Sequence, residues 1–329
     1  MAWTDIAPNK KHQWLTGDLR EEFDGFVPLG VEANKGAQQD GIFRNYGRGV
    51  ATSRDDWAYN FDAAVLTANM RRATEFYNEQ LRHWQNRKNK RLTDPDSFVR
   101  YDDTKLKWSR DLKQDLVRGN ASTFSSDKVR GALYRPFTAT HLYFDRLFNE
   151  EVYQFHEYFP STKSENRTII VGLYGRKHFS ALASDRICDL NFFADPGQCF
   201  PFYTYDGEDR ARRENIPLST LVRFQNHYGD EAITKWDIFH YVYAVLHHPE
   251  YRTRYAANLR RELPRIPLVG AAGGSQASSL TGKTGVAPVT KLIGKVITVS
   301  LETQKLIAAL PSLAVASGEI PQVQKEVKH

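Results

Sequence analysis

The clearest pattern of apolar and polar positions lies between residues 62 and 91. Apolar side chains recur there at intervals of three and four residues, and basic residues occupy the other positions. That spacing places the apolar side chains on one face of an α-helix. The segment therefore predicts one long helix with a buried face formed by Leu66, Met70, Ala73, Tyr77, Leu81 and Trp84.

Short apolar stretches punctuated by glycine and proline predict strands on both sides of this helix. The stretches before residue 61 are FDGFVPLG, GIFRNYGRGVATS and WAYNFD. Those between residues 95 and 230 are SFVRYD, LYRPF, HLYFD, RTIIVGLY and CFPFYTYD. Short helices are expected from Lys105 to Arg118 and from Ser219 to His227. The predicted fold class is α+β, with mixed short strands and helices.

Residues 234–268 predict a pair of helices rich in aromatic side chains. Thr234 and Asp237 have the spacing of a capping box before an apolar run. Pro249 interrupts the run and suits the first position of a second helix. In that second helix Tyr251, Tyr255 and Leu259 recur every four residues, and Pro264 and Pro267 prevent its continuation.

Residues 269–329 differ from the rest of the chain, because they contain no arginine and no aromatic residue. The stretch VGAAGGSQASSLTGKTG has the composition of a linker. The following residues show apolar periodicity but offer few large side chains for a core. We therefore expect a linker and an atypical, poorly structured tail.

Charge and composition narrow the functional classes. The net charge is +6, the calculated pI is about 9.1, and basic residues gather in clusters such as RHWQNRKNKR and KLKWSRDLK. Basic clusters beside Trp84 and Trp108 suit nucleic acid, which offers phosphates and stacking faces; the alternative is a solvated surface whose tryptophans point inward. No apolar run approaches the about 18 residues that span a bilayer, so we expect no membrane partner. Two cysteines suit a reducing compartment, and we expect a cytoplasmic protein.

Catalytic motifs are weak. ASSLTGKT follows a linker rather than a strand, so it does not predict a phosphate loop. Asp96, Asp103 and Lys105 resemble the carboxylates and lysine of a compact Mg²⁺-dependent nuclease, although their spacing is short and TDPDS reads as a turn. The Asn/Asp-Pro-Pro-Tyr/Phe loop of adenine N6 methyltransferases is missing. We expect no metal site, no cofactor and no catalysis by this chain alone.

Eight ordered blocks carry a resemblance to a known family. They are TDIAPNKKHQWL, YGRGVATSRDDWAYNFD, YDDTKLKWSRDLK, LYRPF, NEEVYQF, QCFPFYTYD, RRENI and residues 234–268. Together they resemble the C-terminal target-recognition (specificity) domain of type ISP restriction–modification enzymes, which are related to single-chain type IIG restriction–methylation enzymes. The resemblance implies sequence-specific recognition of double-stranded DNA, with residues 1–60 as a junction to a methyltransferase portion and residues 61–268 as the recognition domain. It also implies that S-adenosylmethionine, ATP and Mg²⁺ serve only the full-length parent enzyme, of which this chain looks like a truncated piece.

Within this resemblance, six basic residues are candidates for contact with DNA. Phosphate contacts would come from basic side chains, and a few polar side chains would read base edges. Arg135 has a second interpretation as the partner of a buried carboxylate, and Arg54 as the partner of Asp55 or Asp56. A module that docks other proteins through its aromatic side chains is a further alternative. The candidates are Lys105, Lys107, Arg110, Lys113, Arg135 and Arg54.

Overall fold

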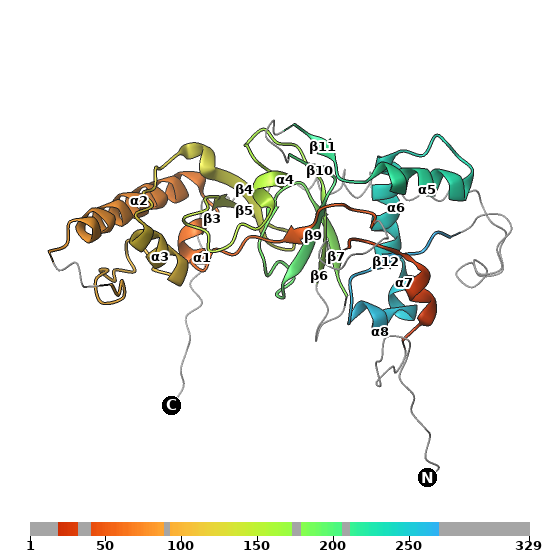
Figure 1. The fold of residues 1–329 in the computed structure, drawn as a ribbon, viewed down its shortest axis with the longest axis horizontal. Coiled ribbons are helices and arrows are strands. Elements are labelled where there is room, and N and C mark those ends of the chain that lie inside the picture. The colour runs from red at the N-terminus through yellow and green to blue at the C-terminus, as the bar shows by residue number, and fades with distance from the viewer. Residues whose placement is uncertain (1–18, 32–40, 89–92, 173–178, 206–210, 270–329) are drawn as a thin grey trace, which may run out of the picture. The chain divides into compact units, whose positions relative to one another are not determined.

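The computed structural model describes residues 19–31, 41–88, 93–172, 179–205 and 211–269 (Figure 1). The predicted linker and tail, apart from Val269, lie outside the described residues. Within the described residues, helices and short strands are mixed along the chain, which confirms the predicted α+β class. No helix of the described part is long and apolar enough to cross a membrane.

One four-stranded sheet is built on a hairpin. Its strands are β3 (Tyr59–Asn60), β4 (Val129–Arg135), β5 (Thr138–Tyr143) and β8 (Ile187–Cys188), in the order β3-β5-β4-β8. β4 and β5 form the hairpin, with an irregularity between Leu133 and Arg135, whereas β8 pairs with β4 in parallel. The LYRPF and HLYFD stretches therefore contribute to strands, as predicted.

A second four-stranded sheet contains β2 (Gly47–Arg48), β6 (Thr168–Gly172), β7 (Ala181–Ser184) and β9 (Gly197–Pro201). Its order is β2-β9-β6-β7 and all its pairings are antiparallel. β6 is an apolar run that is buried along almost its whole length, so it reads as continuous rather than alternating. Side chains of both sheets share one core, which includes Ala132, Leu142, Ile170 and Cys199.

The long predicted helix is α2 (Ala63–Gln85), and all six residues predicted for its inner face are buried. It begins at Asp62, whose carboxylate accepts hydrogen bonds from the backbone N–H groups of Ala64 (2.7 Å) and Val65 (3.1 Å). Figure 1 shows α3 (Arg110–Arg118) beside α2, and both contribute to a core that also contains Trp108 and Phe148. Gly119 ends α3 with a φ of 85°, a left-handed conformation that favours glycine.

Two predictions in this region are wrong. The helix expected from Lys105 begins only at Arg110, because Asp102 and Leu106 form an isolated bridge and Ser109 caps the later start. The strand expected at SFVRYD is replaced by a turn, in which the backbone N–H groups of Asp96 (3.0 Å) and Ser97 (3.2 Å) donate to the Asp94 carboxylate.

The C-terminal helices follow the prediction closely. α5 (Leu218–Tyr228) precedes α6 (Lys235–His247), which begins with the Thr234–Asp237 capping box. α7 (Pro249–Arg254) has Pro249 in its first turn. The second predicted helix is divided, however, because Tyr255 leaves the helical conformation before α8 (Ala256–Leu259).

Short elements complete the described structure. The helical turns are η1 (Glu21–Gly25), α1 (Asp55–Ala58), η3 (Ser126–Lys128) and α4 (Phe155–Tyr158). β1 (Val27–Pro28) pairs with β12 (Arg265–Ile266), and β10 (Tyr203–Thr204) pairs with β11 (Arg213–Glu214). Because β1, β2 and β3 all pair with strands that come later in the chain, the described residues before position 61 are integrated into these sheets. WAYNFD accordingly begins in α1 and becomes a strand only at Tyr59.

Gly49, which follows β2, allows close approach to the backbone of Asp189, which follows β8. A Cβ atom at this position would lie 2.3 Å from the backbone oxygen of Asp189, a distance that no side chain tolerates. The neighbouring Val50 donates to Cys188 (2.8 Å) and accepts from Leu190 (2.7 Å) through backbone groups. The close approach therefore belongs to a hydrogen-bonded backbone pairing.

We predict that Gly49→Ala lowers the free energy of unfolding by about 1–3 kcal/mol, because the added methyl group forces this backbone pairing apart. Gly25→Ala is the matched control, since a Cβ atom there meets nothing within 4 Å. Urea denaturation of the two variants tests the prediction. Equal stabilities of the two would show that the pairing yields without cost.

Candidate nucleic-acid interface

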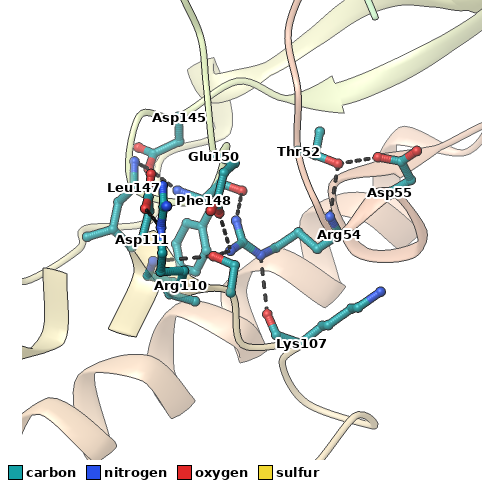
Figure 2. Close-up of polar contacts among 12 residues, drawn as sticks. Thr52, Arg54, Asp55, Lys107, Arg110, Asp111, Asp145, Leu147, Phe148 and Glu150 are labelled. Carbon is teal, nitrogen blue, oxygen red and sulfur yellow. Dashed lines mark hydrogen bonds and ion pairs between the residues drawn. The ribbon is translucent and has the colours of Figure 1, made fainter. Parts of the chain in front are cut away.

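Arg54 lies at the centre of a buried polar cluster (Figure 2). It immediately precedes α1, and only 1% of its side chain is exposed. The guanidinium donates hydrogen bonds to the backbone oxygen of Phe148 and to the Ser109 hydroxyl, and Nε donates to the backbone oxygen of Lys107 at 3.3 Å. One side chain thus connects three segments that are distant in sequence.

The charge of Arg54 is only partly balanced by a carboxylate. Glu150 Oε2 lies 3.7 Å from Arg54 Nη2. Burial lowers the pKa of Arg54 to about 10, while Glu150 and then Asp111 oppose this effect. The guanidinium therefore stays protonated at neutral pH, and its hydrogen bonds to carbonyl oxygens are charge-assisted.

This geometry corrects the expectation that Arg54 pairs with Asp55 or Asp56 or faces DNA. Asp55 instead accepts from the Thr52 hydroxyl and from Tyr134 Oη at 2.8 Å. Because the Arg54 side chain is almost fully buried, it presents no surface to a phosphate in this structure. Its contacts assign it a structural position beneath the basic segment around α3.

The basic segment 105–113 is divided by the late start of α3. Arg110 and Lys113 lie on the helix, whereas Lys105 and Lys107 precede it, so the helical stripe expected from their spacing does not form. Lys107 is exposed, and no carboxylate of the described residues lies within 4 Å of its ammonium. Arg110 is 78% exposed and forms an ion pair with the neighbouring Asp111 (2.9 Å). Both side chains project from a segment that Arg54 binds through the backbone oxygen of Lys107 and the hydroxyl of Ser109.

The other two lysines of this segment are engaged with acidic side chains. Lys113 is 18% exposed and pairs with Asp96. That contact raises the pKa of Lys113, and the Lys113 hydrogen bond lowers the pKa of Asp96. Lys105 Nζ lies 3.9 Å from Asp102. Lys113 therefore anchors the turn that contains Asp96, whereas Lys105 makes only a long ion pair.

Trp84 and Trp108 point inward, in agreement with the second interpretation of the basic clusters. Their side chains are 3% and 9% exposed. Trp108 Nε1 donates to the backbone oxygen of Arg100 at 3.0 Å, and Trp84 packs edge-on against Phe98 with ring centroids 5.1 Å apart. Neither ring is available as a stacking platform for bases in this structure.

The residues of the nuclease hypothesis have other partners. The Asp96 carboxylate accepts hydrogen bonds from Lys113 and from Tyr101 Oη. In the part of the chain that the structure describes, no group of three or more His, Cys, Asp or Glu residues is placed to hold a metal ion. The described geometry therefore supplies no observation in favour of cleavage by Asp96, Asp103 and Lys105.

Arg135 forms the ion pair that its second interpretation anticipated. Its Nη1 lies 2.6 Å from Asp189 Oδ1, and the Asp189 side chain is only 4% exposed. Burial raises the pKa of Asp189, whereas the Arg135 charge lowers it. The Arg135 guanidinium also covers the Tyr134 ring, 3.9 Å from its centroid. A third of the Arg135 side chain remains exposed, so a contact with DNA stays a prediction.

Sequence reasoning did not identify Asp189, Glu150 or Ser109 as partners of these arginines. Asp189 follows the two-residue strand β8, which no periodic pattern marks. The oxygens that bind Arg54 are mostly backbone carbonyls, which carry no residue signature. Only the basic character of the arginines themselves was visible in the sequence.

Comparison with known families identifies the family of this chain. Residues 41–276 match the model of the Type ISP C-terminal specificity domain. The chain belongs to this family, which confirms the resemblance found in the ordered sequence blocks.

Three solved structures are similar to the chain, and each covers 82% of it. A nuclease-deletion mutant of the Type ISP restriction–modification enzyme LlaGI, in complex with a DNA substrate mimic, is 30% identical with a TM-score of 0.66. The DrdV–DNA complex is 33% identical (TM-score 0.67), and the ATP-dependent Type ISP enzyme LlaBIII bound to DNA is 28% identical (TM-score 0.66).

The chain spans only 20%, 26% and 17% of these proteins, respectively. A search of the curated proteins finds no match.

We predict that Arg54→Met lowers the free energy of unfolding by about 3–5 kcal/mol, because it leaves buried carbonyls and the Glu150 carboxylate without their cation. Thermal and urea unfolding measure this change. Lys107→Met is the matched control, since it removes an exposed charge from the same cluster and should change stability little. Equal effects of the two substitutions would contradict the structural assignment of Arg54.

A second prediction concerns pH. Burial places the folded-state pKa of Asp189 above its usual value. The ionised carboxylate therefore lowers the stability of the fold as pH rises through that pKa, and this loss of stability disappears when the carboxyl is protonated. Removing the Arg135 charge raises this pKa further. Arg135→Met should therefore cost about 2–3 kcal/mol near pH 7.5 and clearly less near pH 5.

Urea denaturation at the two pH values tests this sign. Arg167→Met is the control, because Arg167 pairs at 3.4 Å with Asp185, which is 57% exposed, and exposed ion pairs contribute little. If the loss of unfolding free energy caused by Arg135→Met stays constant or grows as pH falls, Asp189 is not the group that the substitution leaves unpaired.

Proposed function

We propose that this chain is the DNA target-recognition part of a type ISP-like restriction–modification enzyme. The observation that carries the proposal is membership of the specificity-domain family, together with three similar structures that each contain DNA. The described structure agrees with this role, since exposed cations project from a firmly held backbone around the start of α3. No described arrangement favours a catalytic alternative.

Lys107 and Arg110 are the first choices for contact with DNA phosphates. Both are exposed, and the ion pair of Arg110 is with the adjacent Asp111. Phosphate contacts set the position of a protein on a duplex and do not depend on sequence. Lys105 and Arg135 would add further phosphate contacts, while Lys113 would act by positioning through its pair with Asp96.

The remaining activities of such an enzyme would lie in other parts of its parent. The chain corresponds to about a fifth of the similar proteins, so a methyltransferase portion is the expected neighbour of this domain. S-adenosylmethionine, ATP and Mg²⁺ would bind there and not to this chain. Recognition would then direct a reaction that other domains perform.

We predict that Lys107→Ala combined with Arg110→Ala weakens binding to every duplex tested. Each phosphate contact that is lost should lower the slope of log affinity against log salt by about one. Fluorescence anisotropy over a salt series, with duplexes of several sequences, measures both quantities. A circular-dichroism spectrum and melting curve check that the variant is folded.

Arg167→Ala combined with Arg186→Ala is the matched control, because it removes two cations that both lie near Asp185. That control should bind DNA like the unmodified chain. If the Lys107/Arg110 variant keeps its affinity and slope, these residues do not contact DNA. If the unmodified chain binds no duplex, or binds a protein partner with little salt dependence, the docking alternative replaces DNA recognition.

A further inference from the structure

A hollow of about 680 Å³ with a mixed polar and apolar lining opens beside the first residues of β4. It is bordered by the segment 121–125, by the turn that follows β5, and by residues 160–162. Its lining combines cations and hydroxyl groups with apolar side chains, and Asp127 and Asp145 also contribute to it. The residues on which the inference depends are Ser122, Lys128, Arg130, Arg146, His156 and Ser161.

Arg130 is the unusual member of this lining. It is 8% exposed, and its Nη2 donates to the backbone oxygen of Ser161. No carboxylate of the described residues lies within 4 Å of it, and burial alone lowers its pKa, with no opposing charge. Arg54 and Arg135, in contrast, each have a carboxylate nearby. A buried cation without a counter-charge is costly, and a bound anion would offset that cost.

Other groups around the hollow also lack a counter-charge or a hydrogen-bond partner among the described residues. Arg146 is exposed and likewise has no described carboxylate within 4 Å, whereas Lys128 is paired with Asp145 at 2.5 Å. Ser122 Oγ and His156 Nδ1 are buried without a hydrogen-bond partner. A hydroxyl and a ring nitrogen can both donate hydrogen bonds. Among the described residues, the lining therefore offers two cations without a nearby carboxylate and two buried polar atoms without a hydrogen-bond partner to one acceptor-rich ligand.

We propose that this hollow binds a phosphate group, held by Arg130 at its base and Arg146 at its mouth. A guanidinium presents paired N–H donors whose geometry matches the oxygens of a phosphate. The expected source is a backbone phosphate of DNA, which rests on the proposed function. Free inorganic phosphate carries the same chemistry and is the other source to be distinguished.

Arg130→Met is a favourable test, because the structure shows that the hydrogen-bond acceptor of Arg130 keeps another donor. The Ser161 oxygen still accepts a hydrogen bond from the backbone N–H of Ser164 at 3.2 Å, so no carbonyl is left without a donor. Replacing an unpaired buried charge by an apolar side chain is often neutral or stabilising. In phosphate-free buffer the variant should therefore melt at the same temperature as the unmodified chain, or higher.

The first experiment adds sodium phosphate to the full chain at constant ionic strength, with sodium chloride as the balance. The melting temperature of the unmodified chain should rise by roughly 2–4 °C, and that of Arg130→Met should not change. Arg186→Met is the matched control, because Arg186 is exposed, has Asp185 as its partner and should respond like the unmodified chain. If Arg130→Met fails to fold, Arg146→Met tests the same site from its exposed rim and should respond less.

The second experiment identifies the source of the phosphate. Arg130→Met should lower the salt slope of duplex binding by about one, as expected for a single lost phosphate contact. If phosphate stabilises the chain through Arg130 while the slope is unchanged, the hollow is a site for free phosphate. If the chain binds no DNA, the proposed function fails, but the melting experiment still decides the site. Equal phosphate responses of Arg130→Met and the unmodified chain overturn the proposal.

Discussion

The burial of the Arg54 guanidinium is the constraint on which the region around α3 depends. A buried cation must find hydrogen-bond acceptors, and here they come from Lys107, Ser109 and Phe148. Ser109 is also the residue that caps α3, so the same contact helps to set where that helix begins. Phe148 in turn belongs to the core beneath α2. The position of the exposed Lys107 and Arg110 thus follows from a side chain that never reaches the surface (Figure 2).

The two buried arginines and the partly exposed Arg135 have three different electrostatic surroundings. Arg54 is held mainly by carbonyl oxygens, and Arg135 by a buried carboxylate. Arg130 has one carbonyl and no counter-charge among the described residues. Removing a guanidinium from water costs free energy, and each of these arginines offsets that cost in a different way. Arg54 and Arg135 stabilise the fold, whereas Arg130 is the arginine whose charge a bound anion would balance.

The secondary-structure elements that could be predicted are those specified by a local sequence pattern. α2 has a long apolar period and α6 has a capping box, so the start of each was found, although α2 ends at Gln85 and not at residue 91 as predicted. Strands such as β2, β3 and β8 have two residues each, and their existence depends on partners far along the chain. The segment from Lys105 to Ser109 has helical spacing but forms no helix, because the Asp102–Leu106 bridge and Arg54 hold its backbone in another conformation. Local propensity was overridden by tertiary contacts.

The candidate site shows the same division. Basic residues in clusters could be recognised from the sequence, and the ordered blocks indicated the family. Which cations are free could not be predicted, because Lys113 pairs with Asp96 across a turn and Arg54 binds Phe148, 94 residues away. The exposed cations that remain are suited to phosphates, which carry no sequence information. Under the proposed function, discrimination between targets would come from side chains that meet base edges, where each contact affects only its own base pair, and from the shape of the DNA. The basic segment would then fix the register, and specificity would be a separate property of the surface that the register brings to the bases.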